Sequence, residues 1–306
     1  MFLTLLSSAL WGSTYTLVQI GLNYYSTYQI SFLRALLAII AMLAIVFAFQ
    51  RKTMAAELFF LPRDKENWAL LISASIFGSA GFWTLLNLSV KYLNADTASF
   101  VSALYPLIAL VLASFLLKEK MTFGRALGVT IGIIGAYLIL SYGKTSSRSS
   151  EPVLGTIFAL MTALAFAGYI IVCRILIGRK DKKSGHTFSP AYVTLATFTI
   201  AVPPTLILAG LSAPLSTLFN SSPTAIGAIL FLGIFCSAVA FLVFNLGLKM
   251  VGAARASINQ LLFPVVSIIL SYFLLGETIN ASDALGIFMI LGGILVAQRI
   301  GSPIKV

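Results

Sequence analysis

The sequence predicts an all-α integral membrane protein with ten transmembrane helices in two inverted five-helix repeats. Its composition, its apolar runs and an internal duplication support this prediction. The 306-residue chain is 59% hydrophobic and only 9% charged, with a mean hydropathy of +1.00. A water-soluble globule cannot bury so much apolar surface, so a lipid bilayer must surround most of the chain.

Ten apolar runs have the length of a membrane span, about 20 residues each. They cover residues 2–21, 28–49, 67–90, 95–117, 123–142, 152–175, 188–209, 223–248, 254–275 and 281–299. No basic region precedes the first run, so we expect a transmembrane helix there rather than a cleaved signal peptide. No long soluble domain remains between the runs.

The second half of the chain repeats the first. Residues 87–143 match residues 245–301 at a constant offset of 158, without a gap. Clear pairs are Asn87 with Asn245, Pro106 with Pro264, and Glu119 with Glu277. Because each unit holds five spans, an odd number, the second unit must enter the membrane upside down, as in many secondary transporters. We place the first repeat at 1–143 and the second at 152–306.

The basic residues predict the orientation. The formal net charge is +11, and sixteen of the 20 Lys and Arg lie in or beside the loops on the side of the N-terminus. The other side holds Lys91, Lys144 and Arg148. By the positive-inside rule, the chain is a multi-pass protein of the cell membrane with both termini in the cytoplasm. This distribution explains the positive charge without a nucleic-acid partner.

The sequence offers no catalytic set. Its nine acidic residues and its one histidine, His186, lie in loops or at helix ends, and no nucleophile has a neighbouring base. Cys173 and Cys236 lie in separate spans without metal-ligand spacing, which is typical of small buried side chains. We therefore predict that the protein is not an enzyme and that it uses no metal or cofactor.

Neutral polar and aromatic side chains inside the spans are the candidates for binding a substrate. Trp11 lies near the middle of its span, away from the headgroup level, and shares a helix face with Tyr15. The candidate substrate-binding residues are Trp11, Ser13, Tyr15, Trp83, Asn87, Tyr105, Tyr169, Asn245, Asn259 and Gln260. Each alone is also explained by packing. Together they predict a cavity for a neutral or zwitterionic organic solute, because a phosphate would require several buried cations.

Four further residues are assigned structural or coupling roles. Arg34 is costly inside a span, and its apolar surroundings favour a structural partner over a substrate anion. Asp96 suits a helix N-terminus and is also the one candidate for proton coupling. Pro106 and Pro264 are expected to bend their helices and shape the cavity. Glycines in 124–135 allow either packing within a monomer or a homodimer face.

These motifs resemble those of the drug/metabolite transporter superfamily, in particular its EamA-type ten-span exporters. The resemblance rests on the Trp-Gly near the start, the Phe-Leu-Arg of the second span, and the Pro, Glu and Gly positions of each half. It implies a basket in which spans 1, 3, 4, 6, 8 and 9 line a central cavity and spans 5 and 10 lie at the periphery. It also implies export of amino acids or other small metabolites. The second half departs from the pattern, with Ala165 and Phe166 where the first has Trp11 and Gly12.

The leading functional prediction is a secondary transporter that exports small organic metabolites, with amino acids favoured, by alternating access. Uniport, exchange and proton antiport all remain open. The expected partners are a small-molecule substrate and membrane lipid. One alternative is a carrier of nucleotide sugars or sugar phosphates, which the shortage of cations within the spans disfavours. An alternative of another class is a membrane protein that does not transport, such as a sensor, a scaffold or a lipid-modifying enzyme.

Overall fold

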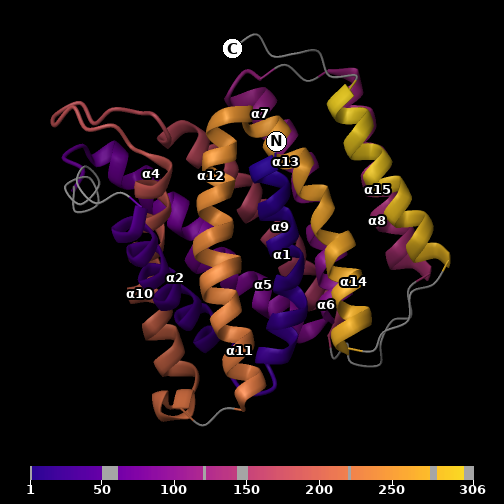
Figure 1. Cartoon of the computed structure of the whole chain (residues 1–306), viewed down its shortest axis with the longest axis horizontal. Helices are drawn as coiled ribbons and strands as arrows, with labels where there is room; N and C mark the ends of the chain where they lie inside the picture. Colours follow the sequence, from indigo (N-terminus) through magenta and orange to yellow (C-terminus); the bar gives the residue numbers. More distant parts are fainter. Residues whose placement is uncertain are drawn as a thin grey trace.

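The computed structural model describes residues 2–49, 61–119, 122–142, 151–219, 222–275 and 281–299. Within these ranges the chain forms a bundle of helices that run roughly side by side (Figure 1). The first five spans are α1 (Phe2–Gly21), α2 (Thr27–Phe49), α4–η1–α5 (Lys65–Ser75, Ile76–Ala80, Gly81–Tyr92), α6–α7 (Ala95–Ser102, Tyr105–Leu116) and α8 (Phe123–Tyr142). The last five are α9 (Pro152–Leu176), α10 (Pro190–Ser212), α11–η3–α12 (Pro223–Phe231, Leu232–Val239, Ala240–Val251), α13–η4–α14 (Ala253–Asn259, Gln260–Leu262, Phe263–Leu275) and α15 (Ala281–Arg299).

The ten predicted spans are confirmed, with ends that fall within a few residues of the predicted ones. Seven of the described helices are long and apolar enough to cross a membrane, and α8 and α15 contain shorter apolar stretches. The remaining helix, α1, is more polar because it contains several serines and threonines, whose side chains are buried inside the bundle. α1 begins and α15 ends at the same end of the bundle (Figure 1).

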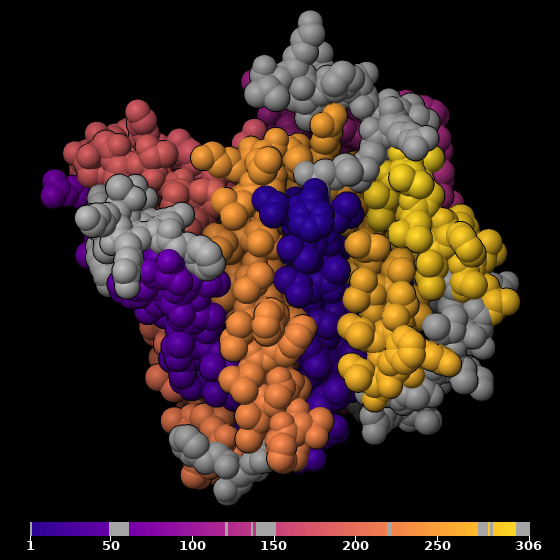
Figure 2. Space-filling model, viewed as in Figure 1, coloured from indigo at the N-terminus to yellow at the C-terminus, as the bar shows by residue number. Residues whose placement is uncertain are grey.

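The first helix of each half packs mainly against helices of the other half. α1 packs against α12 and α14, and its counterpart α9 packs against α5 and α7. Figure 2 shows α1 lying between the orange helices of the second half. Spans 2 and 7 pack against each other, as do spans 5 and 10. This reciprocal pattern is the one expected of inverted repeats, and the centre of the bundle is shared by both halves.

Two contacting backbones hold α8 against α15. A Cβ atom on Gly128 would overlap the carbonyl oxygen of Gly293, and a Cβ atom on Gly293 would overlap that of Gly128. A Cβ atom on Gly135 would lie 2.7 Å from the carbonyl oxygen of Gly286. Only glycine allows this close approach. Gly128 and Gly135, for which both packing and a dimer face were considered, therefore face another helix of the same chain.

Interruptions occur at equivalent positions in the two halves. The π-helical turns η1 and η3 are related by the offset of 158 residues, and so are the breaks before α7 and α14. Pro106 and Pro264 lie in the first turn of α7 and α14, where the missing N–H group costs nothing. The spans are thus divided near their middle, beside the central cavity.

The loop between spans 6 and 7 is fixed to the beginning of span 3 by Asp181. One carboxylate oxygen of Asp181 accepts hydrogen bonds from the Arg63 backbone N–H and the Asn67 side chain, both at 3.1 Å. The other accepts bonds of 2.9 Å from the backbone N–H and the hydroxyl of Ser184. Burial alone would raise the pKa of Asp181, but these hydrogen bonds hold the pKa well below its usual value.

Candidate functional site

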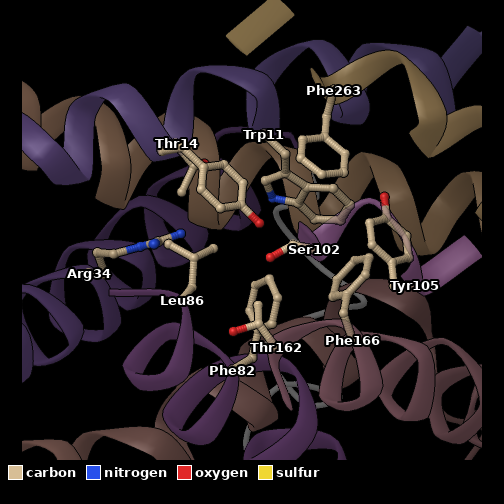
Figure 3. A pocket seen from close by; sticks show the side chains of 11 residues that line it. Trp11, Thr14, Arg34, Phe82, Leu86, Ser102, Tyr105, Thr162, Phe166 and Phe263 are labelled. Atoms are coloured by element: carbon tan, nitrogen blue, oxygen red, sulfur yellow. The ribbon is translucent and has the colours of Figure 1, made fainter. Parts of the chain in front are cut away.

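A cavity lies at the centre of the bundle between the two halves (Figure 3). Helices α1, α2, α5, α6 and α7 line it from the first half, and α9 and α14 from the second. The lining residues are Trp11, Thr14, Tyr15, Arg34, Phe82, Leu86, Ser102, Tyr105, Thr162, Phe166 and Phe263. The volume of the cavity is about 20 Å³, which is enough for about one or two water molecules. Its walls must therefore separate to admit an organic solute.

Aromatic rings form one wall of the cavity. The ring centroids of Trp11 and Tyr105 each lie 4.9 Å from that of Phe166, in edge-to-face geometry. Tyr15 and Tyr105 stack against Phe263 at 5.6 and 5.8 Å. Tyr105 and Phe263 are equivalent positions of the two repeats, 158 residues apart. The inverted halves thus bring a stacked pair to the centre, and the wall suits an apolar or aromatic group.

Trp11 is held in place by the π-helical turn η3. Its Nε1–H donates to the carbonyl oxygen of Cys236 at 2.8 Å. The indole also contacts Phe241 and Phe244, with centroid distances of 4.9 and 5.2 Å. A buried indole requires such a partner for its N–H group. The ring is therefore fixed on one edge while it faces Phe166 and the cavity.

Hydroxyl groups provide part of the polar lining. Thr162 donates to the carbonyl oxygen of Phe158 at 2.7 Å, and Ser102 donates to that of Ala159 at 3.5 Å. Since a hydroxyl group has one proton and two lone pairs, both oxygens can still accept a hydrogen bond. Figure 3 shows the Ser102 hydroxyl near the middle of the cavity. A ligand that donates hydrogen bonds would find acceptors here.

Arg34 lies at the other end of the cavity from the aromatic wall (Figure 3). Its side chain has no exposed surface. Nε donates to the hydroxyl oxygen of Ser237 at 3.2 Å, and the guanidinium carbon lies 4.9 Å from the ring centre of Trp83. The sequence favoured a structural role for Arg34 because its neighbours along the helix are apolar. In the structure the same residue also lines the cavity.

Of the ten predicted substrate-binding residues, Trp11, Tyr15 and Tyr105 line the cavity. Trp83 lies behind the Arg34 guanidinium, with its ring tilted against Phe198 at 5.4 Å. The Trp83 ring therefore faces the arginine rather than the cavity.

The predicted amides lie between helices instead. Asn87 donates to the Thr27 carbonyl at 3.1 Å and to the Ser31 hydroxyl at 3.0 Å, which connects α5 to α2. Asn245 donates to the Tyr169 hydroxyl at 2.7 Å and to the Thr194 hydroxyl at 2.9 Å, which connects α12 to α9 and α10. Equivalent asparagines thus connect equivalent helices in the two halves.

The remaining predicted residues also make contacts away from the cavity lining. Gln260 donates to the Thr4 carbonyl at 2.7 Å, and Asn259 donates to the Thr4 hydroxyl at 2.6 Å, which holds α1 against η4 and α13. Ser13 donates to the Leu10 carbonyl at 2.7 Å within α1. The hydroxyl of Ser271 donates to the carboxylate of Asp96 at 2.7 Å, between α14 and α6.

The cavity has seven lining residues that the sequence analysis did not select: Thr14, Phe82, Leu86, Ser102, Thr162, Phe166 and Phe263. The repeat offset could have identified Phe263 as the counterpart of Tyr105. Among the described residues, no group of three or more His, Cys, Asp or Glu side chains could hold a metal ion.

The sequence profile of the EamA-like transporter family matches residues 1–141 and 153–298. The chain belongs to the EamA-like transporter family. The profile matches twice, once in each half of the chain. The chain is therefore a multi-pass membrane transporter.

Similar family proteins span nearly the whole chain. The uncharacterized transporter YyaM of Bacillus subtilis (strain 168) is 26% identical over 298 residues, which cover 94% of this chain and 90% of YyaM. A probable amino-acid metabolite efflux pump of Salmonella typhimurium is 24% identical over 302 residues, which cover 96% of this chain and 93% of the pump. A solved crystal structure covers 98% of this chain and 99% of its own with a TM-score of 0.73 and 20% identity, which shows a shared fold.

Proposed function

We propose that this transporter exports amino acids or closely related small metabolites across the cell membrane by alternating access. The observation that carries the proposal is the central cavity, because it is lined by both inverted halves and joins an aromatic wall to a buried cation. The similarity to a probable amino-acid metabolite efflux pump supports this class of substrate. A nucleotide sugar or sugar phosphate suits the site less well, since Arg34 is the one cationic side chain among the described lining residues.

Alternating access requires a contact that closes one end of the cavity, and Glu119 supplies a candidate. Its two carboxylate oxygens accept hydrogen bonds of 3.0 Å from the backbone N–H groups of Ala253 and Ala254. These N–H groups begin α13, after Gly252 with its φ of 80°. The carboxylate thus joins the end of span 4 to the beginning of span 9, at the end of the bundle where α1 begins (Figure 1). Opening this end requires the two spans to part.

The lining also bears on energy coupling. No Asp, Glu or His side chain belongs to the described lining of the cavity. Proton-coupled carriers use such groups within the membrane, so uniport or exchange is favoured as the transport mode. Asp96, which accepts the hydrogen bond from Ser271, remains the candidate for proton coupling.

Counterflow in proteoliposomes tests the proposal. Vesicles loaded with a mixed unlabelled amino-acid pool should accumulate an external labelled amino acid without any ion gradient. Thr162→Trp fills the cavity and should abolish this accumulation. Leu164→Trp is the matched control, because Leu164 lies two residues away on α9 and is 57% exposed. This control should leave counterflow intact. Accumulation that survives Thr162→Trp, or the absence of counterflow for every amino acid, would overturn the proposal.

A further inference from the structure

Most of the hydrogen-bonding capacity of Arg34 is unused. An arginine side chain has five N–H donors, and Arg34 uses the one on Nε for Ser237. In the part of the chain that the structure describes, neither Nη1 nor Nη2 has an acceptor. Burying polar donors without partners is costly, and buried arginines that only fix helices normally satisfy them with carbonyl oxygens. The unpaired donors therefore indicate a ligand rather than a structural contact.

Among the described residues, the positive charge of Arg34 is also left without an anion. The ion pairs among the described residues connect Arg174 with Glu119, and both Arg179 and Lys182 with Glu66. None of these pairs includes Arg34, whose guanidinium carbon lies 4.9 Å from the ring centre of Trp83. A buried cation inside a membrane normally pairs or faces a polar pathway. Arg34 lines the central cavity, where a bound anion could pair with it.

The guanidinium group is held in a fixed orientation from behind. The Ser237 hydroxyl donates to the Leu232 carbonyl at 2.8 Å, so its oxygen is free to accept the bond from Nε of Arg34. A Cβ atom on Gly233 would overlap the side chain of Leu37, so this glycine lets η3 approach α2 closely. The Nη1 and Nη2 ends point toward the cavity (Figure 3). A planar fork held in this way matches the two oxygens of a carboxylate.

We propose that Arg34 binds the carboxylate of the transported solute while the aromatic wall holds its apolar body. The ligand class is thus an organic monocarboxylate with a branched or aromatic body. No carboxylate belongs to the described lining, so only hydroxyl groups and rings would meet an ammonium group. The carboxylate of the solute therefore contributes most of the binding specificity. Acids that lack the amino group should compete with the corresponding amino acids for this site. This inference rests on the proposed function, since it names the substrate class of the same cavity.

The first test uses the unaltered protein, purified as the full chain in detergent. Binding of phenylacetate is compared with that of phenylacetamide, and binding of 4-methylpentanoate with that of 4-methylpentanamide, by calorimetry. Each amide matches its acid in shape and lacks only the charge. Because charge-assisted hydrogen bonds are lost, each amide should bind about 10- to 100-fold more weakly than its acid. Equal affinities within each pair, or no binding of either acid, would overturn the inference.

The second test uses variants of buried arginines. Arg34→Gln should abolish the preference for acid over amide, and Arg34→Lys should keep part of it. Arg125→Gln is the matched control, because Arg125 is 2% exposed and lies on α8 outside the cavity lining. This control should keep the full preference. An Arg34→Gln protein that still prefers the acids would overturn the inference.

Counterflow separates this inference from the proposed function. If the unaltered protein transports a solute and Arg34→Gln transports it equally well, the carboxylate assignment is wrong while the transporter assignment stands. If the unaltered protein binds the acids selectively and counterflow fails for every amino acid, the Arg34 site stands and the proposed function is wrong.

Discussion

Removing the Glu119 carboxylate should favour the conformation in which the end of the bundle at α13 is open. In Glu119→Ala, the backbone N–H groups of Ala253 and Ala254 lose their acceptors. Each hydrogen bond to a charged group contributes about 1.5 kcal/mol or more, but water can replace the carboxylate once the end opens. We therefore expect a net shift of about 2 kcal/mol, which is roughly 30-fold in the conformational equilibrium.

The two backbone hydrogen bonds of Glu119 should contribute more to this equilibrium than its ion pair with Arg174. Arg174 approaches the carboxylate at 3.9 Å, and its side chain is 39% exposed. Such exposed ion pairs contribute only about 0 to 1 kcal/mol. Arg174→Gln should therefore change the equilibrium much less than Glu119→Ala, whereas Glu119→Gln, which keeps one acceptor, should fall between them.

Labelling with a membrane-impermeant maleimide measures the shift. A cysteine introduced by Ser102→Cys lies in the cavity lining, and Cys173 and Cys236 are replaced by alanine to remove background. From the side on which α1 begins, the Glu119→Ala protein should be labelled about 10- to 30-fold faster than the protein with Glu119. Equal labelling rates would refute the reasoning, and so would an equal effect of Arg174→Gln.

Three further predictions concern packing and the Asp181 loop. Trp11→Phe keeps an aromatic ring but loses the hydrogen bond to Cys236, so thermal unfolding should show a loss of at least about 1 kcal/mol. Solute binding in counterflow should also weaken, and unchanged stability and binding would contradict this. The side chain of Gly128→Leu would force α8 away from α15 at Gly293, which should cost about 1 to 3 kcal/mol of stability. A melting temperature equal to that of the unaltered protein would contradict the close contact between Gly128 and Gly293. The Asp181 carboxylate has a lowered folded pKa, so its stabilisation is present above the unfolded pKa of about 3.9 and is lost as the pH falls through the folded value. Asp181→Asn should therefore lower the melting temperature at neutral pH and flatten its decline in acid, and a parallel pH profile for both proteins would oppose this role.

The architecture could be predicted from sequence because the bilayer imposes a length on each apolar run. The predicted span 2–21 matches α1, and 123–142 matches α8. The odd number of spans in each repeat then requires inversion whatever the side chains do. The π-helical turns η1 and η3 could not be predicted, because no residue preference in their sequences distinguishes them from α-helix.

The cavity was only partly predictable because a polar residue in a span has two uses that look alike in sequence. Asn87 and Trp11 both gave the same signal, yet the amide connects two helices while the indole lines the cavity. Whether a polar side chain connects two helices or lines the cavity depends on how its helix is rotated about its axis, and hydropathy does not reveal that rotation. Phe166 was missed for the opposite reason, since a phenylalanine in a span is expected to face lipid or a neighbouring helix.

The most direct test of the central claim is a structure determined with the solute that counterflow identifies. The account predicts the bound solute in the central cavity, with its carboxylate at Arg34 and its body in contact with Trp11, Tyr105 and Phe263. A solute bound outside this lining, with the cavity still closed, would contradict the account.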